Sequence, residues 1–217
     1  MSITKKTYYR IGDMVFVSRF STLKEIKVAV LLITAIGLLT ASPSRAMIIN
    51  PTEKQVDEAV AYGKKHKDNI EKIKEEYSYP SISGKDDFVA VVTKVSLLKL
   101  LSAYNEKRGQ KLGENEIDGI LNAKSFYIKA YLLGDDVNFA TDIHGVIEIG
   151  GRVIQPVEVK PMVWAIPSLA WPQSPSYKAA NYYYFDYGEK NGNEKITFIL
   201  QKPGGDTRFE IDLSKYD

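Results

Sequence analysis

Apolar and polar residues alternate with two different periods along the chain, and the period changes near residue 124. Between residues 51 and 122, apolar side chains recur every three or four positions, which is typical of amphipathic helices. From Ser125 onward they recur at every second position, which is typical of half-buried strands. The pattern predicts a helical segment over 47–124 with one short strand at 88–92, followed by a β-rich segment over 125–217.

The first helix is marked by a capping signal. Thr52 is followed three residues later by Gln55, the spacing at which two side chains satisfy the unpaired amides of a helix start. The lysine-rich stretch around His66 is interpreted as a solvated helix face or as a break before a second helix. The helical pattern between the strands at 88–92 and 126–133 is long enough for a crossover connection.

The β-rich segment is punctuated by turn signals. Gly150-Gly151 lies between two alternating runs, a strong signal for a two-residue hairpin. Strands recurring at intervals of about 8–12 residues predict a sandwich or barrel. The predicted strands are 126–133, 137–140, 146–149, 152–159, 162–166, 181–187, 195–201 and 207–213.

We therefore expect an α+β fold: an immunoglobulin-like antiparallel β-sandwich of about eight strands with an N-terminal helical layer. The likeness is one of pattern alone. The chain has no cysteine, so the disulfide of antibody domains is missing and no family function follows from the architecture.

An uncharged apolar run precedes both segments. Val28–Ala41 contains fourteen residues without a charge, whereas a membrane-spanning helix needs about 20 apolar residues. This length fits the apolar centre of a secretory signal, and Lys24 and Lys27 supply its positive flank. We expect residues 1–46 to be a leader, and the exported chain to have no stable membrane span.

The cleavage position is indicated by small residues after the run. Ser44–Ala46 gives a small-x-small pattern, so the mature chain is predicted to begin at Met47, with cleavage after Ala41 or Ser42 as the alternative. An uncleaved anchor is the competing interpretation, which the short run disfavours. The charged region before the run is long for a leader, so we hypothesise that residues 1–13 come from a mis-called translation start or form a weakly ordered tail.

Charge is unevenly distributed between leader and remainder. Residues 1–46 carry seven Lys or Arg and two Asp or Glu, a net charge of +5, whereas the whole chain carries +2; the remainder therefore carries −3. A mildly acidic domain has no general attraction for phosphate backbones, which argues against nucleic-acid binding. The absence of cysteine excludes disulfides, thiolate metal sites and a thiol nucleophile.

The sequence offers little sign of catalysis. It contains no GxSxG, HExxH, GxxxxGK[ST] or GxGxxG motif, so we expect no enzyme, no catalytic residue and no cofactor. Acidic residues on the predicted strands alternate with apolar ones and should face solvent; a hydrolase using converging carboxylates is the least favoured hypothesis. These residues are Glu148, Glu158, Asp186, Glu210 and Asp212.

One oxygen-rich stretch, DDVNFATDIH, is a candidate calcium site. Asp135, Asp136, Asn138 and Asp142 are the ligand types that calcium takes, but their spacing differs from an EF-hand loop. The same residue types are required by turns, and we favour turn chemistry.

Aromatic residues give the best candidates for binding. Tyr182 and Tyr184 share one face of a predicted strand, and Trp164 and Trp171 bracket a proline-containing loop. Exposed rings of this kind bind sugars and proteins. The competing interpretation, which we favour for the tryptophans, is that both fill the sandwich core.

The expected function is that of an exported, periplasmic or secreted, non-enzymatic binding or scaffold protein of the bacterial envelope, with a protein or glycan partner. The alternative is a carbohydrate- or cell-wall-binding module that uses the four aromatic residues.

Export predicts a shortened chain. Intact-mass measurement on protein from the secreted or periplasmic fraction should give a chain beginning at or near Met47. A mass that still includes residues 28–46 would contradict the leader and support the anchor.

Overall fold

The structure is a computed structural model that describes residues 7–11, 14–18, 47, 49–82, 87–188 and 195–216. The chain divides into two compact units, residues 1–44 and 45–217, which are described separately. In the first unit, strands β1 (Thr7–Ile11) and β2 (Met14–Ser18) pair antiparallel. The apolar run of the expected leader and its candidate cleavage positions lie outside the described residues.

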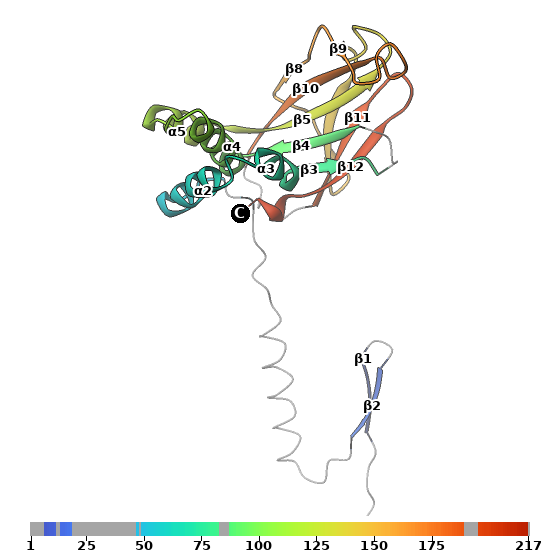
Figure 1. The fold of residues 1–217 in the computed structure, drawn as a ribbon. Coiled ribbons are helices and arrows are strands. Elements are labelled where there is room, and N and C mark those ends of the chain that lie inside the picture. The colour runs from blue at the N-terminus through green and yellow to red at the C-terminus, as the bar shows by residue number, and fades with distance from the viewer. Residues whose placement is uncertain are drawn as a thin grey trace, which may run out of the picture. The chain divides into compact units, whose positions relative to one another are not determined.

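Helices form the first part of the second unit, and Figure 1 shows them gathered beside one end of the strands. They are α2 (Glu53–Lys65), α3 (Ile70–Glu76), α4 (Lys94–Lys107) and α5 (Glu114–Leu121). The predicted capping box is confirmed, since the Thr52 N–H donates to Gln55 Oε1 at 2.9 Å and the Gln55 N–H donates to Thr52 Oγ1 at 3.4 Å. The lysine-rich stretch contains a break, after which Asn69 caps α3.

Two antiparallel sheets make up the rest of the second unit. One has the order β3-β4-β5-β10-β8, with β9 also paired to β10, and the other has the order β12-β11-β6-β7. The first comprises β3 (Ser78–Pro80), β4 (Phe88–Val92), β5 (Ser125–Gly134), β8 (Glu158–Lys160), β9 (Ile166–Pro167) and β10 (Tyr177–Asp186). The second comprises β6 (His144–Ile149), β7 (Arg152–Ile154), β11 (Lys195–Gln201) and β12 (Thr207–Asp212), and a short 3₁₀ helix at Leu213–Lys215 follows it.

Side chains from both sheets meet in one hydrophobic core, so the β-region is a sandwich. Tyr183 and Phe185 from β10 lie against Phe198 from β11, with ring centroids 5.5 and 6.3 Å apart. Phe198 also contacts Phe209 of β12, at 6.2 Å. All four are buried, and since each aromatic side chain buries ~150–250 Å², they supply much of the attraction between the sheets.

Helices α2, α4 and α5 pack on one another around a smaller apolar cluster that includes Val56, Ala59, Leu98 and Ile120, whereas Ile70 and Ile73 of α3 belong to the main core. At the contact of α2 with α4, Gly63 leaves no room for a side chain, because a Cβ there would lie 2.2 Å from the Lys99 carbonyl oxygen. The predicted layer is therefore a helical cluster in which two backbones approach closely.

Three of the predicted strands are wrong in extent. The segment 137–140 is a turn, in which the Asn138 N–H donates to Asp136 Oδ1 at 2.7 Å. The segment 152–159 is divided into β7 and β8 around Pro156, which has no N–H for a ladder bond. The segment 162–166 is mostly loop, because its Ala165 N–H bonds to the Val137 carbonyl of a neighbouring turn instead of a strand.

The predicted crossover is also wrong, because β4 and β5 are antiparallel neighbours with Val92 opposite Tyr127. After β4 the chain leaves the sheet, forms helices α4 and α5, and re-enters the sheet as β5 at the same end. In addition, the strand β3 was missed, since its three residues are too few for a periodic pattern. The helical segment thus contributes two strands to a sheet that it shares with the β-rich segment.

The Gly150-Gly151 hairpin is confirmed. It joins β6 to β7 with Ile149 opposite Arg152, and both glycines have positive φ, 55° and 77°. That backbone conformation is the one that a two-residue primed turn requires.

Replacing Gly63 by alanine should destabilise the fold. Because the added Cβ meets backbone atoms of α4, the helices must separate, and overpacking of this kind costs ~1–3 kcal/mol in the free energy of unfolding. The matched control is Gly119→Ala in α5, where no atom lies within 4 Å of the added Cβ; alanine is preferred there by roughly 0.5–1 kcal/mol. Urea unfolding measures both changes, and equal stability of Gly63→Ala and the wild type would contradict the close contact.

Candidate functional site

The outward face of the six-stranded sheet carries a row of aromatic side chains, which we call the aromatic face: Phe88 of β4, Tyr127 and Tyr131 of β5, and Tyr182 and Tyr184 of β10. Strand pairing places them side by side, since Tyr131 is opposite Phe88 and Tyr127 is opposite Tyr184. The rings of Phe88 and Tyr131 stack at 4.3 Å. Tyr127 lies 5.3 Å from Tyr184 and 5.8 Å from Tyr182, between ring centroids.

Lysine side chains lie over these rings. Lys129 Nζ is 4.4 Å from the ring centroid of Tyr131 and 5.3 Å from that of Tyr182, and Lys160 Nζ is 4.6 Å from that of Tyr184. Burial lowers the pKa of Lys129, but its hydrogen bond with Tyr131 and the nearby phenol oxygens raise that pKa above its ordinary value overall, so the ammonium stays charged. The aromatic face therefore holds fixed positive charge among rings, an arrangement stabilised by cation–π attraction.

Two cavities open over the aromatic face, and together they form what we call the groove. The larger has a volume of about 780 Å³ and the smaller about 510 Å³. They share Phe88, Tyr131 and Tyr182, so they meet over the middle of the face. Sites for small organic ligands are commonly ~300–1,000 Å³, and each cavity lies in that range.

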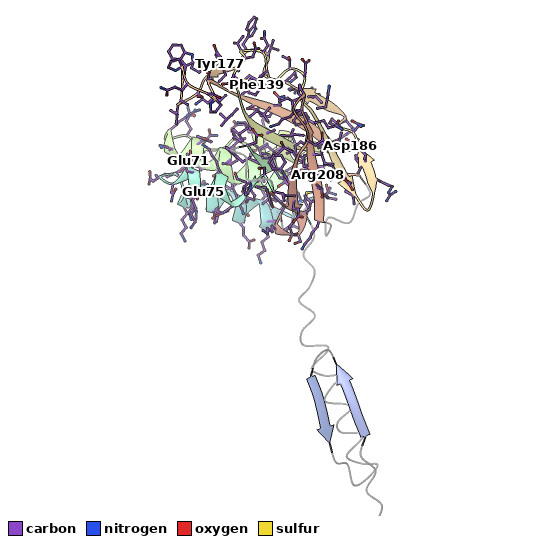
Figure 2. The ribbon with its side chains drawn as sticks, turned by 90° about the vertical axis from the view of Figure 1, so that its right-hand side faces the viewer. Glu71, Glu75, Phe139, Tyr177, Asp186 and Arg208 are labelled. Atoms are coloured by element: carbon purple, nitrogen blue, oxygen red, sulfur yellow. The ribbon has the colours of Figure 1, made fainter. Side chains whose placement is uncertain are left out.

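Two different segments of the second unit form the walls of the groove, and they lie at opposite ends of it in space. Helices α3 and α4 line the smaller cavity with residues that include Glu71, Glu75 and Leu100. Met162 and Ile166, from the segment after β8, line the larger cavity. Figure 2 shows Glu71 and Glu75 at the helical end, and Tyr177 at the start of β10 at the other.

Charge differs between the two cavities. Lys160 and Lys178 line the larger one, and the described residues place no carboxylate in its lining. Glu158 lies just outside and pairs with Lys160 at 3.2 Å. The smaller cavity has two lysines and two glutamates, of which Lys74 and Glu71 form an ion pair at 2.6 Å. The larger cavity is therefore the positive part of the groove.

Of the aromatic residues predicted from the sequence, the structure places two in the groove and two elsewhere. Tyr182 and Tyr184 lie on its floor. Trp164 and Trp171 line neither cavity, and 68% and 56% of their surfaces are exposed. The expectation that both tryptophans fill the core is wrong, because the core is already filled by rings from the strands and the tryptophans lie on a loop outside it.

Sequence reasoning missed Phe88, Tyr127, Lys129, Tyr131 and Lys160 as site residues. A signal for three of them was present, since the run FYIKAYLL puts Tyr127, Lys129 and Tyr131 on the same phase of a strand. Their neighbours across the sheet belong to distant parts of the chain, so no local pattern joins them.

The acidic stretch 135–142 forms turns and anchors a loop. Asp135 accepts a hydrogen bond from the Ser176 N–H at 2.9 Å and from the Ser174 hydroxyl at 2.8 Å. These two bonds lower the pKa of the Asp135 carboxyl below its ordinary value. In the described ranges no three His, Asp or Glu side chains are grouped to hold a metal ion. The calcium hypothesis for Asp135, Asp136, Asn138 and Asp142 stays a prediction.

Three of the five acidic residues predicted on strands, Glu148, Glu158 and Asp212, lie in surface ion pairs or a cap. Glu148 of β6 pairs with Arg208 of β12 at 3.2 Å, and Asp212 accepts the Ser214 N–H at 3.0 Å at the start of the 3₁₀ helix.

Within the described ranges, no helix is long and apolar enough to span a bilayer.

Comparison of the chain with protein-family models, with curated proteins and with solved structures gives no match. The groove must therefore be interpreted from its own residues.

Chelation should leave the fold intact. If 135–142 is only turn chemistry, EDTA should not change the melting temperature. A metal that binds the native state would add about 2.7 kcal/mol of stability at a hundredfold excess over its Kd. A rise in melting temperature with added calcium would contradict the turn interpretation.

Proposed function

We propose that the protein is a non-enzymatic binding protein of the bacterial cell envelope, and that the groove is its ligand-binding site. The observation that supports this most directly is the aromatic face, where five rings and the charged Lys129 line the two cavities of the groove. Half-buried tyrosines on a rigid sheet offer large contact area at a low cost in conformational entropy. The motif search and the absence of cysteine support a binding role over catalysis.

Location in the envelope is part of the proposal. It is supported by the apolar run Val28–Ala41 with its lysine flank, which resembles a secretory leader. Its shortness for a bilayer span favours release of the chain into the periplasm or medium.

A second candidate function, a carbohydrate- or cell-wall-binding module, is favoured by the chemistry of the larger cavity. Tyr182 and Tyr184 line this cavity, where their rings can contact the C–H groups of a sugar beside Lys129 and Lys160, and their hydroxyls can exchange hydrogen bonds with sugar hydroxyls. Lys160 and Lys178 would donate to a carboxylate on the sugar. The ligand that best fits is therefore an oligosaccharide with an acidic group. In this candidate Trp164 and Trp171 are not part of the site.

We also propose that the sandwich is immunoglobulin-like. In that fold one sheet has the strand order A-B-E-D, and strand C′ extends the G-F-C sheet in some members. Taking β4 as strand A and continuing along the chain, with β9 as an addition, gives A-B-E-D for β4-β5-β10-β8 and G-F-C-C′ for β12-β11-β6-β7. Helices α4 and α5 then form an insertion between strands A and B.

The two faces of β10 provide the test. The double substitution Tyr182→Ser/Tyr184→Ser should weaken binding at least tenfold and reduce stability only modestly, because both rings are half-buried at the groove floor. The control pair, Tyr183→Ser/Tyr187→Ser, removes two core rings and should cost several kcal/mol, as large-to-small aromatic changes cost ~3–5 kcal/mol each. Urea unfolding and titration with neutral and acidic oligosaccharides, including solubilised peptidoglycan fragments, measure the two effects.

A charge control separates the two candidate functions. Lys160→Gln should weaken binding of acidic oligosaccharides, whereas Lys195→Gln, an exposed lysine on β11, should leave it unchanged. If no saccharide binds but a partner protein requires Tyr182 and Tyr184, the carbohydrate candidate fails and the general binding role stands. If Tyr182→Ser/Tyr184→Ser leaves all binding unchanged, the groove is not the site.

A further inference from the structure

The segment between β8 and β10 is an exposed apolar loop. We define the apolar loop as residues 161–176, which include β9 and contain no charged side chain. Its large hydrophobic side chains are mostly outside the core. Leu169 is fully exposed, and the other exposed members are Val163, Trp164, Ile166 and Trp171. Exposed apolar residues this concentrated mark an interaction surface.

Several backbone N–H groups of the apolar loop are paired within the loop. The Ser168 N–H donates to the Ser176 carbonyl at 2.9 Å, the Gln173 N–H donates to the Ala170 carbonyl at 2.8 Å, and the Ala170 N–H donates to Ser168 Oγ at 3.0 Å. The four prolines at 161, 167, 172 and 175 have no N–H to satisfy. Each of these paired N–H groups lowers the cost of moving the loop out of water.

The base of the apolar loop is fixed to the sandwich at both ends. At the first end, the Met162 N–H donates to the side-chain oxygen of buried Asn181 at 2.9 Å. At the second end, Asp135 accepts bonds from Ser174 and Ser176. In Figure 2 Phe139, from the turn next to this base, and Tyr177 lie at the same end of the molecule. The exposed side chains are therefore presented by a braced loop.

We propose that the apolar loop docks on a lipid bilayer, with Leu169 entering the acyl boundary and Trp164 and Trp171 lying at headgroup level. Tryptophan is enriched at that depth in membrane proteins. Leucine at the tip of an uncharged loop is an apolar side chain that can enter the acyl boundary. Leu169 is fully exposed, so the tip is available for insertion.

Charge at the base of the loop fits the headgroup layer. Lys160 and Lys178 bracket the loop, at the level where anionic headgroups would lie once the tip is inserted. Glu158 pairs with Lys160 and Asp135 lies at the same base, so apolar contact supplies most of the binding. Anionic lipid should therefore strengthen binding only a few-fold. The loop borders the groove, since Met162 and Ile166 line the larger cavity, but the proposed membrane-contacting residues Leu169, Trp164 and Trp171 line neither cavity.

Tryptophan fluorescence tests the proposal directly. Trp164 and Trp171 are the only tryptophans in the sequence, so emission from the full-length chain reports on the loop and on no other segment. Vesicles of phosphatidylcholine with one third phosphatidylglycerol should shift the emission to the blue, and brominated lipid should quench it. Emission that is unchanged by either vesicle overturns the proposal.

A matched pair of variants tests the role of the tip. Val163→Ser/Leu169→Ser should weaken vesicle binding about tenfold or more, with both tryptophans still present as probes. The control Val153→Ser/Val157→Ser removes two exposed valines that lie outside the loop, and it should change vesicle binding less than twofold. Equal quenching of the two variants overturns docking by the loop.

A protein partner is the competing occupant. Sedimentation velocity without lipid would reveal self-association, and a dimer that Val163→Ser/Leu169→Ser abolishes would assign the loop to an interface between copies, overturning the lipid proposal. Oligosaccharide binding in the groove should be unaffected by the loop variants. If oligosaccharide binding is lost in the groove variants and kept in the loop variants, the proposed function is tested separately from the membrane docking.

Discussion

The side chains of β10 alternate between the core and the groove, and the rest of the molecule depends on which set is buried. Tyr183 and Phe185 lie against Phe198 in the core, so Tyr182 and Tyr184 must lie on the opposite face. A strand has a period of two, and a shift of one residue would exchange the two sets completely. The packing of Phe198 between the sheets thus fixes the floor of the groove, although Phe198 does not touch it.

Buried polar groups on the same strand hold the surrounding loops in place by hydrogen bonds. Asn181 is fully buried, and its amide nitrogen donates to the Ala140 carbonyl at 2.7 Å while its oxygen accepts the Met162 N–H. The Tyr183 hydroxyl donates to the Ile143 carbonyl at 2.8 Å. Because buried polar groups are costly when unpaired, these bonds hold both loops against the sandwich. The wall of the groove and the base of the apolar loop therefore share an anchor.

Local chemistry explains which parts of the fold and the site were predictable. The capping box at Thr52, the Gly150-Gly151 hairpin and the alternation of β10 all depend on neighbours within a few residues, and each was predicted correctly. The segments 137–140 and 162–166 are also rich in apolar residues, yet they are mostly turn and loop. Local bonds to Asp136 close the turn at 137–140, and in 162–166 the Ala165 N–H bonds to the Val137 carbonyl instead of a neighbouring strand. Tyr182 and Tyr184 were identified because they are neighbours on one strand, while Phe88 and Lys160 meet them only across the sheet.

The sequence by itself determined the two-part pattern of helices and strands, the cysteine-free core and the division of β10 into two faces, because these follow from residue type and spacing along one segment. Only the tertiary structure decided that β4, β5 and β10 lie side by side, that β5 returns antiparallel to β4, and that both tryptophans face outward. The physical reason is that pairing of strands is a contact between residues far apart in the chain. Packing decides which of several apolar segments fills a core of limited volume. In this protein the rings of the strands fill the core, and the tryptophans of the loop lie outside it.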